Sequence, residues 1–170
     1  MTAETVATEL VDIDHLGLNV SNLAASERWY QDMLGFHILH RWKTTTLVGL
    51  GNVKLGLFWR PDAKPIDNLD SWICMQHLAF LVDGNRFIQT RQKLIEKGID
   101  VVNEDNGIAY CVFFEDPDGH LLELITYHAV PRADLSPWFD PQTHPPEYIS
   151  KELHDHVPRR RERSVPPSPP

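Results

Sequence analysis

The 170-residue chain has only two cysteines, and no apolar run in it is long enough to cross a bilayer. Cys74 and Cys111 fall in segments with strand character and lack the close spacing of a zinc site. We therefore expect two buried, inert thiols in a reducing, cytoplasmic protein. The opening MTAETVATELV has no basic stretch followed by an apolar core, so we expect neither a secretory signal nor a membrane partner.

Positive charge is also scarce. Lys and Arg number 16 against 24 Asp and Glu, which gives a net charge of −8 with histidine neutral. This balance excludes a general nucleic-acid surface, and no nucleic-acid-binding motif is present. The one basic run, at 159–163, lies in a segment that holds most of the prolines. Because proline interrupts regular structure, we expect a single domain over residues 1–130 and an extended proline-rich tail over 131–170.

The chain contains an internal repeat. The segment DHLGLNVSNLAASERWYQDMLGF begins at Asp14, and QHLAFLVDGNRFIQTRQKLIEKGI begins at Gln76. Each opens on a polar residue and a histidine, continues as an apolar strand, and passes through a turn into an amphipathic helix. Ser21 or Asn22 can cap the first helix, and each helix ends at a glycine, as a left-handed terminating residue requires.

Three short apolar segments follow each helix. They are FHILHRW, TTLVGL and KLGLFWR in the first half, and IDVVNE, AYCVFF and HLLELITY in the second. Each half therefore predicts a strand, a helix and three further strands. We place these two βαβββ modules at about residues 11–60 and 74–128, which makes the fold α+β.

Side-chain alternation predicts a metal site. Successive strand residues point to opposite faces, so the apolar residues should pack under the helices and His15, His77 and Glu123 should point away from them. A lone histidine or glutamate on a strand is usually structural or solvated. Two histidines at equivalent repeat positions, with a carboxylate on the same face, instead indicate a facial triad for a divalent metal with open coordination positions.

These residues resemble the vicinal oxygen chelate superfamily, which includes glyoxalase I, extradiol dioxygenases, fosfomycin-resistance thiol transferases and bleomycin-binding proteins. The resemblance covers residues 11–127 and is carried by DHLGLNV, WYQDMLGF, QHLAFLV and FFEDPDGHLLEL. It implies that the two modules pair into an eight-stranded open cup. It also implies that His15, His77 and Glu123 bind Fe(II), Mn(II) or Zn(II).

The sequence differs from each subfamily at one or more functional positions, and these differences exclude only some of the possible reactions. Glyoxalase I has a fourth metal ligand on the last strand of its first module. The equivalent position here, which aligns with Glu123 of the second module, is Gly56, and glycine cannot ligate a metal. Phe113 stands where extradiol dioxygenases and fosfomycin enzymes usually have a tyrosine. The stretch VVNEDNGIAYC lacks the serine and lysine of the fosfomycin enzymes' potassium loop. Bleomycin-binding members lack the metal ligands that this chain retains.

We therefore expect a metal-dependent enzyme for a small organic substrate, with an extradiol-type dioxygenase favoured. A glyoxalase-like isomerase or lyase, a fosfomycin-type thiol transferase and a non-catalytic ligand-sequestering protein remain alternatives. By resemblance the working unit is a homodimer, with a site shared between chains favoured over a site within one chain. Tyr127 is the candidate acid, and candidate bases are His37, His40 and His120. The expected substrate-binding residues are Trp42, Phe58, Phe113 and Tyr127.

Overall fold

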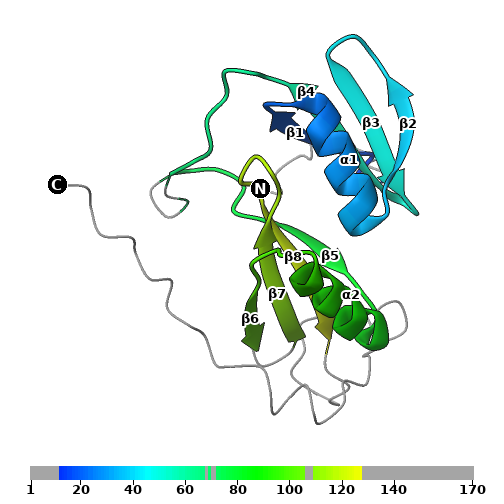
Figure 1. Cartoon of the computed structure of the whole chain (residues 1–170), viewed down its shortest axis with the longest axis vertical. Helices are drawn as coiled ribbons and strands as arrows, with labels where there is room; N and C mark the ends of the chain where they lie inside the picture. Colours follow the sequence, from blue (N-terminus) through cyan, green and yellow to red (C-terminus); the bar gives the residue numbers. More distant parts are fainter. Residues whose placement is uncertain (1–11, 68, 70–71, 106–108, 128–170) are drawn as a thin grey trace, which may run out of the picture. The chain divides into compact units, whose positions relative to one another are not determined.

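The computed structural model describes residues 12–67, 69, 72–105 and 109–127 (Figure 1). The chain divides into two units, Met1–Pro65 and Ile66–Pro170, and each is described by itself. The predicted tail at 131–170 lies outside the described residues. In the part of the chain that is described, no helix is both long and apolar enough to span a membrane.

The first unit is a βαβββ module. Its sheet has the strand order β1-β4-β3-β2. The first strand, β1, lies at an edge and pairs in parallel with the last strand, β4. The remaining pairs are antiparallel. The elements are β1 (Leu16–Val20), α1 (Leu23–Leu34), β2 (His37–Arg41), β3 (Thr45–Leu50) and β4 (Val53–Trp59).

The second unit repeats this topology. Its sheet order is β5-β8-β7-β6, again with the first and last strands parallel. In each unit the helix lies across one face of its own sheet (Figure 1). The elements are β5 (Leu78–Leu81), α2 (Gly84–Glu96), β6 (Val102–Asp105), β7 (Ala109–Glu115) and β8 (Leu121–Tyr127). The two predicted βαβββ modules are therefore confirmed.

Local signals in the sequence fix the helix ends. The side chain of Asn22, rather than Ser21, accepts a hydrogen bond from the backbone N–H of Ala25 and caps α1. Asp83 caps α2 in the same way. Gly35 and Gly98 have φ angles of 76° and 77°, the left-handed conformation that glycine adopts without a steric penalty.

The predicted alternation of faces holds, but the histidines lie outside the strands. Leu18 and Val20 are buried, whereas Gly17 and Asn19 between and beside them are exposed. The prediction that the strands include His15 and His77 is wrong, since β1 begins at Leu16 and β5 at Leu78. The physical reason is pairing: the parallel ladders begin at Leu16–Leu55 and Leu78–Leu122, one residue beyond each histidine.

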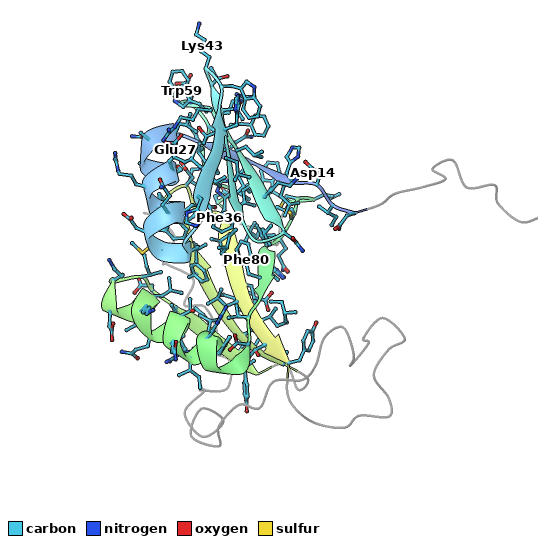
Figure 2. All side chains as sticks on the ribbon, turned by 90° about the vertical axis from the view of Figure 1, so that its right-hand side faces the viewer. Asp14, Glu27, Phe36, Lys43, Trp59 and Phe80 are labelled. Atoms are coloured by element: carbon cyan, nitrogen blue, oxygen red, sulfur yellow. The ribbon has the colours of Figure 1, made fainter. Side chains whose placement is uncertain are left out.

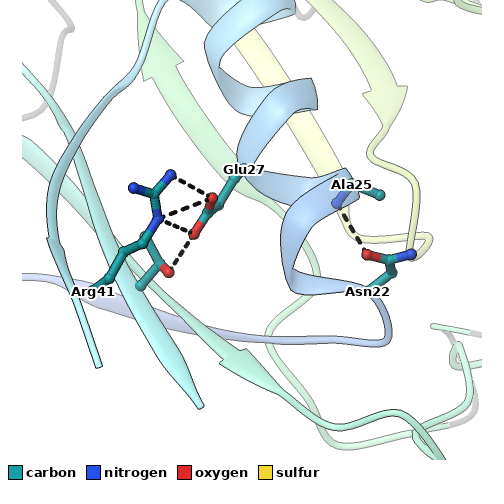
Figure 3. A network of polar contacts seen from close by, with 5 residues as sticks. Asn22, Ala25, Glu27 and Arg41 are labelled. Atoms are coloured by element: carbon teal, nitrogen blue, oxygen red, sulfur yellow. Dashed lines mark hydrogen bonds and ion pairs between the residues drawn. The ribbon is translucent and has the colours of Figure 1, made fainter. Parts of the chain in front are cut away.

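Polar contacts join each helix to strands of its own sheet. In the first unit the buried Glu27 of α1 accepts hydrogen bonds from Nε and Nη2 of Arg41 and from the hydroxyl of Thr46 (Figure 3). The hydrogen bonds from Arg41 are the main cause that lowers the pKa of Glu27. In the second unit, Nε of Arg91 on α2 donates to Asn103 on β6 over 2.5 Å. The two modules therefore share a helix-to-strand contact built from different residues.

The cysteine prediction is half right. Cys111 is buried on β7, as expected. Cys74 is exposed and lies before β5 rather than in a strand, so the expectation of a second buried thiol is wrong. Its neighbours Ile73 and Met75 are exposed as well, which shows that the apolar residues of this segment do not form a buried strand.

Candidate metal centre

The second unit brings two of the predicted ligands together. Nε2 of His77 lies 2.9 Å from Oε2 of Glu123. Glu123 is only 5% exposed although it is a carboxylate. Phe113 pairs with Glu123 in the β7–β8 register, and its ring meets the His77 ring edge-on at a centroid distance of 5.6 Å. His77, Glu123 and Phe113 therefore form one cluster on the sheet face that the alternation predicted.

The hydrogen bond at Nδ1 of His77 determines which ring nitrogen can face Glu123 as a ligand. Nδ1 of His77 lies 3.2 Å from Oε1 of Gln76, and an amide oxygen can only accept a hydrogen bond. A neutral imidazole that donates through Nδ1 presents a lone pair at Nε2, directed at the carboxylate of Glu123. Two acceptors 2.9 Å apart require a cation between them, either a proton or a metal ion. One imidazole nitrogen and one carboxylate oxygen fit Fe(II), Mn(II) or Zn(II).

The first unit presents its histidine in a matching way. Nδ1 of His15 lies 2.8 Å from Oδ2 of Asp14, the residue that precedes it. The other carboxylate oxygen of Asp14 binds the ammonium group of Lys54. The two contacts, Lys54 foremost, lower the pKa of Asp14. Figure 2 shows Asp14 where the chain enters β1, on the side of the first sheet away from α1. Since a carboxylate cannot donate, Nδ1 of His15 carries the hydrogen and Nε2 is left to ligate.

The first unit has a glycine where the second has its acid. Gly17 pairs with Gly56 in the first sheet as Ala79 pairs with Glu123 in the second. A methyl group placed on Gly56 would lie 3.5 Å from Cδ2 of His15 and 3.0 Å from Cε2 of Phe58. The Phe58 ring thus covers the glycine position beside the histidine. The guanidinium of Arg60 lies 6.0 Å from the centre of that ring.

The remaining predicted residues are not all brought to these clusters. Tyr127 shares the Glu123 face but stands four residues further along β8, about 13 Å away at strand spacing, with Ile125 between them. Trp42 is 56% exposed, follows β2, and contacts the ring of His40 at 4.3 Å. Among the described residues, no three His, Cys, Asp or Glu side chains are grouped closely enough to hold a metal ion. His15 belongs to one unit, and His77 and Glu123 belong to the other.

The candidate base His120 has a structural contact. Its Nδ1 lies 2.8 Å from Oδ2 of the buried Asp116, and that hydrogen bond is the main cause that raises the pKa of His120. Asp116 also accepts from the backbone N–H groups of Asp118 and His120, so it closes the turn before β8. His37 and His40 are exposed on β2.

The sequence carries a signal for the two histidine partners. Asp14 and Gln76 are the polar residues that open the two repeats, one position before each histidine. Side chains of consecutive strand residues diverge, which is why a strand assignment concealed the contacts. They become possible because each pair lies just before its strand begins.

Comparison with known proteins decides the family. The model of the Glyoxalase/Bleomycin resistance protein/Dioxygenase superfamily matches residues 12–124. The chain belongs to this superfamily. The match confirms the resemblance in the sequence and agrees with the βαβββ topology that both modules share.

Relatives within the superfamily differ in their reactions. The chain is 32% identical to the metallothiol transferase FosB of Staphylococcus haemolyticus over 67% of this chain and 82% of that protein. It is 26% identical to biphenyl-2,3-diol 1,2-dioxygenase 3 of Rhodococcus globerulus, over 65% and 60% of the two chains. The crystal structure of a glyoxalase family protein from Enterococcus faecalis matches with a TM-score of 0.59 at 27% identity, covering 68% of this chain and 97% of the other.

Proposed function

We propose that the protein is a metal-dependent enzyme that binds a small organic substrate through two neighbouring oxygen atoms. The contact between Nε2 of His77 and the buried carboxylate of Glu123 carries this proposal, because both groups are metal ligands by type and a divalent ion can take the place of the proton between them. His15, with Nε2 presented in the same manner, is the third ligand. A divalent metal held there supplies Lewis acidity and, as Fe(II), the capacity to activate dioxygen.

The surroundings of the ligands favour an aromatic or apolar substrate. Phe113 packs against His77, and Phe58 covers the glycines beside His15. Two cations near the His15 cluster are already engaged: Lys54 binds Asp14, and Arg60 binds the Trp59 carbonyl and lies over Phe58. An extradiol-type dioxygenase acting on a catechol is therefore the first candidate. We also propose substrate contacts for Trp42 and Tyr127, and the role of proton donor for Tyr127. Since Tyr127 stands about 13 Å from Glu123 along β8, this role requires a substrate that extends along the strand toward Tyr127.

Thiol transfer of the fosfomycin type is the second candidate. Its support is the 32% identity to a metallothiol transferase, which exceeds the identity to the dioxygenase relative. The residue Phe113 does not distinguish the two candidates, because both groups usually have a tyrosine at that position.

One experiment distinguishes these reactions. Purified protein is loaded in turn with Fe(II), Mn(II) and Zn(II), then assayed for oxygen uptake with a panel of catechols and for thiol consumption with fosfomycin. We expect metal-dependent oxygen uptake with Fe(II). The test variant is His77→Ala, which should lose the metal and the activity, while the control His37→Ala, on the exposed β2, should still bind the metal. Thiol consumption without oxygen uptake would establish the second candidate, and failure to bind any of the three metals would refute the proposal.

We also propose a homodimer in which the modules of two chains pair, so that His15 of one chain joins His77 and Glu123 of the other. The superfamily membership supports this arrangement. A His15→Ala chain mixed with a Glu123→Ala chain tests it. A shared site restores one complete triad in the mixed dimer, and metal binding partly recovers. A site within each chain predicts no recovery, because each mutant chain lacks one of its own ligands.

A further inference from the structure

The two candidate ligand histidines are held by the same device. In each unit Nδ1 contacts the side-chain oxygen of the residue immediately before the histidine, at 2.8 Å for Asp14 and 3.2 Å for Gln76. We propose that Asp14 and Gln76 are positioning residues of the metal centre, each accepting the Nδ1 hydrogen of the following histidine and thereby presenting its Nε2. This inference rests on the proposed function, because it assigns its meaning to the same three ligands.

The backbone explains why a sequence neighbour can serve. Residues 12–15 and 75–77 have no regular secondary structure, and the strands begin at Leu16 and Leu78. Consecutive side chains would point to opposite faces if the strands started earlier. Because pairing begins one residue later, the carboxylate of Asp14 and the amide of Gln76 reach the imidazole on the same side. The late strand starts are thus a precondition of both contacts.

The chemistry of the two acceptors is not equal. Asp14 can only accept, so the tautomer of His15 is fixed whatever the rotamer. Gln76 carries both an acceptor and a donor, and its oxygen faces Nδ1 of His77. The carboxylate also raises the electron density of its imidazole more than a neutral amide does. His15 is therefore the more strongly donating ligand of the two.

A purely structural role for Asp14 makes a different prediction. Asp14 is exposed and forms an ion pair with Lys54, which on its own could account for the presence of the carboxylate. The position equivalent to Lys54 in the second unit is Leu121, one residue before the Leu78–Leu122 pair, so Gln76 has no such cation opposite. The histidine contact is common to both units and the ion pair is not. Because exposed ion pairs contribute little, Lys54 should matter little to metal binding.

Metal affinity measured by chelator competition with Zn(II) tests the inference on the full chain. Asp14→Ala and Gln76→Ala should each weaken Zn(II) binding about 10-fold, the lower end of the effect of losing an orienting partner. Asp14→Asn and Gln76→Glu keep an acceptor oxygen and should restore affinity to within about 3-fold of wild type, whereas a merely structural loss would not be rescued this way. Lys54→Met should bind like wild type. Unchanged affinity in both alanine variants, or a loss in Lys54→Met equal to that in Asp14→Ala, would overturn the inference.

The tautomer of His15 provides a readout that needs no metal. Long-range ¹H–¹⁵N spectra of the imidazoles in metal-free protein, recorded where histidine is neutral, should show hydrogen on Nδ1 of His15. Asp14→Asn should preserve this tautomer, and Asp14→Ala should lose it. Hydrogen on Nε2 of His15 in the wild-type protein would refute the role of Asp14. If the wild-type chain bound no Zn(II), the proposed function would fail while this measurement still decided whether Asp14 orients His15.

Discussion

The two modules share a topology and a way of holding a histidine, yet they differ at the position opposite that histidine. In the second module Glu123 stands 2.9 Å from His77. In the first module the equivalent residue is Gly56, and the Phe58 ring fills the space. The difference shows that the repeated framework fixes where a ligand can stand, while the residue at each position determines whether the module contributes an acid or an aromatic wall.

The largest expected effect comes from removing the histidine that faces the acid. His77→Ala leaves Glu123 buried without its imidazole partner and should weaken Zn(II) binding by more than about 100-fold, beyond the range seen for orienting partners alone. Isothermal titration would measure this. His37→Ala, an exposed histidine on β2, is the matched control and should keep wild-type affinity. Full affinity in His77→Ala would remove the second module from the metal centre.

Next in size is the helix contact of the first module. Glu27→Leu leaves the hydroxyl of Thr46 buried without its acceptor and should lower the free energy of unfolding by about 2 kcal/mol. Arg91→Leu breaks the corresponding contact with Asn103 in the second module and should cost about 1 kcal/mol, because both groups are only partly buried. Urea denaturation compares the two variants. Equal costs would show that the contacts are energetically interchangeable.

The Glu27 effect should also depend on pH. The pKa of Glu27 is lowered from its ordinary value of 4.5 in the folded protein, chiefly by the hydrogen bonds from Arg41. Its ionised form therefore stabilises the fold fully above pH 4.5, and that stabilisation is lost as the pH falls through the lowered folded pKa. The stability difference between wild type and Glu27→Gln should shrink in acid. A difference that stayed constant down to low pH would contradict this account.

A smaller effect is expected from adding a methyl group where the first module has glycine. In Gly56→Ala the new Cβ would lie 3.0 Å from Cε2 of Phe58, so the ring must shift, at a cost of about 1 kcal/mol. Gly17→Ala presses on the same ring at 3.1 Å and should behave alike. In a Phe58→Ala background both costs should disappear. Persistent costs in that background would place the strain elsewhere than at the ring.

The smallest effect concerns the ion pair between His120 and Asp116 in the turn before β8 of the second module. The pKa of His120 is raised above 6.5, mainly by its hydrogen bond to Asp116. The stabilisation of the fold by protonated His120 is therefore complete below pH 6.5. It is lost as the pH rises through the raised pKa of His120 in the folded protein. His120→Gln should be less stable than wild type by less than about 1 kcal/mol at pH 5.5, with a smaller gap at pH 9. A gap that widened with pH would contradict this sign.

The sequence predicted the repeat, the two βαβββ modules and the meeting of His77 with Glu123, because periodicity and alternation are local properties. It did not predict the start of the strands at Leu16 and Leu78, which depends on where the parallel partners begin. Nor did it find the buried Glu27, whose partners Arg41 and Thr46 are 14 and 19 residues away. Cys74 was misassigned because apolar composition alone does not distinguish a strand from an exposed connection.

The late strand starts have a consequence for how the site is encoded. Each imidazole takes its orientation from its own sequence neighbour, so the information lies in a dipeptide, Asp14–His15 or Gln76–His77, and not in a distant part of the fold. Each contact lies within its own module, so it does not depend on which module stands opposite. In the proposed exchanged dimer each histidine would therefore keep its orienting neighbour, and that neighbour can change by mutation without disturbing a strand.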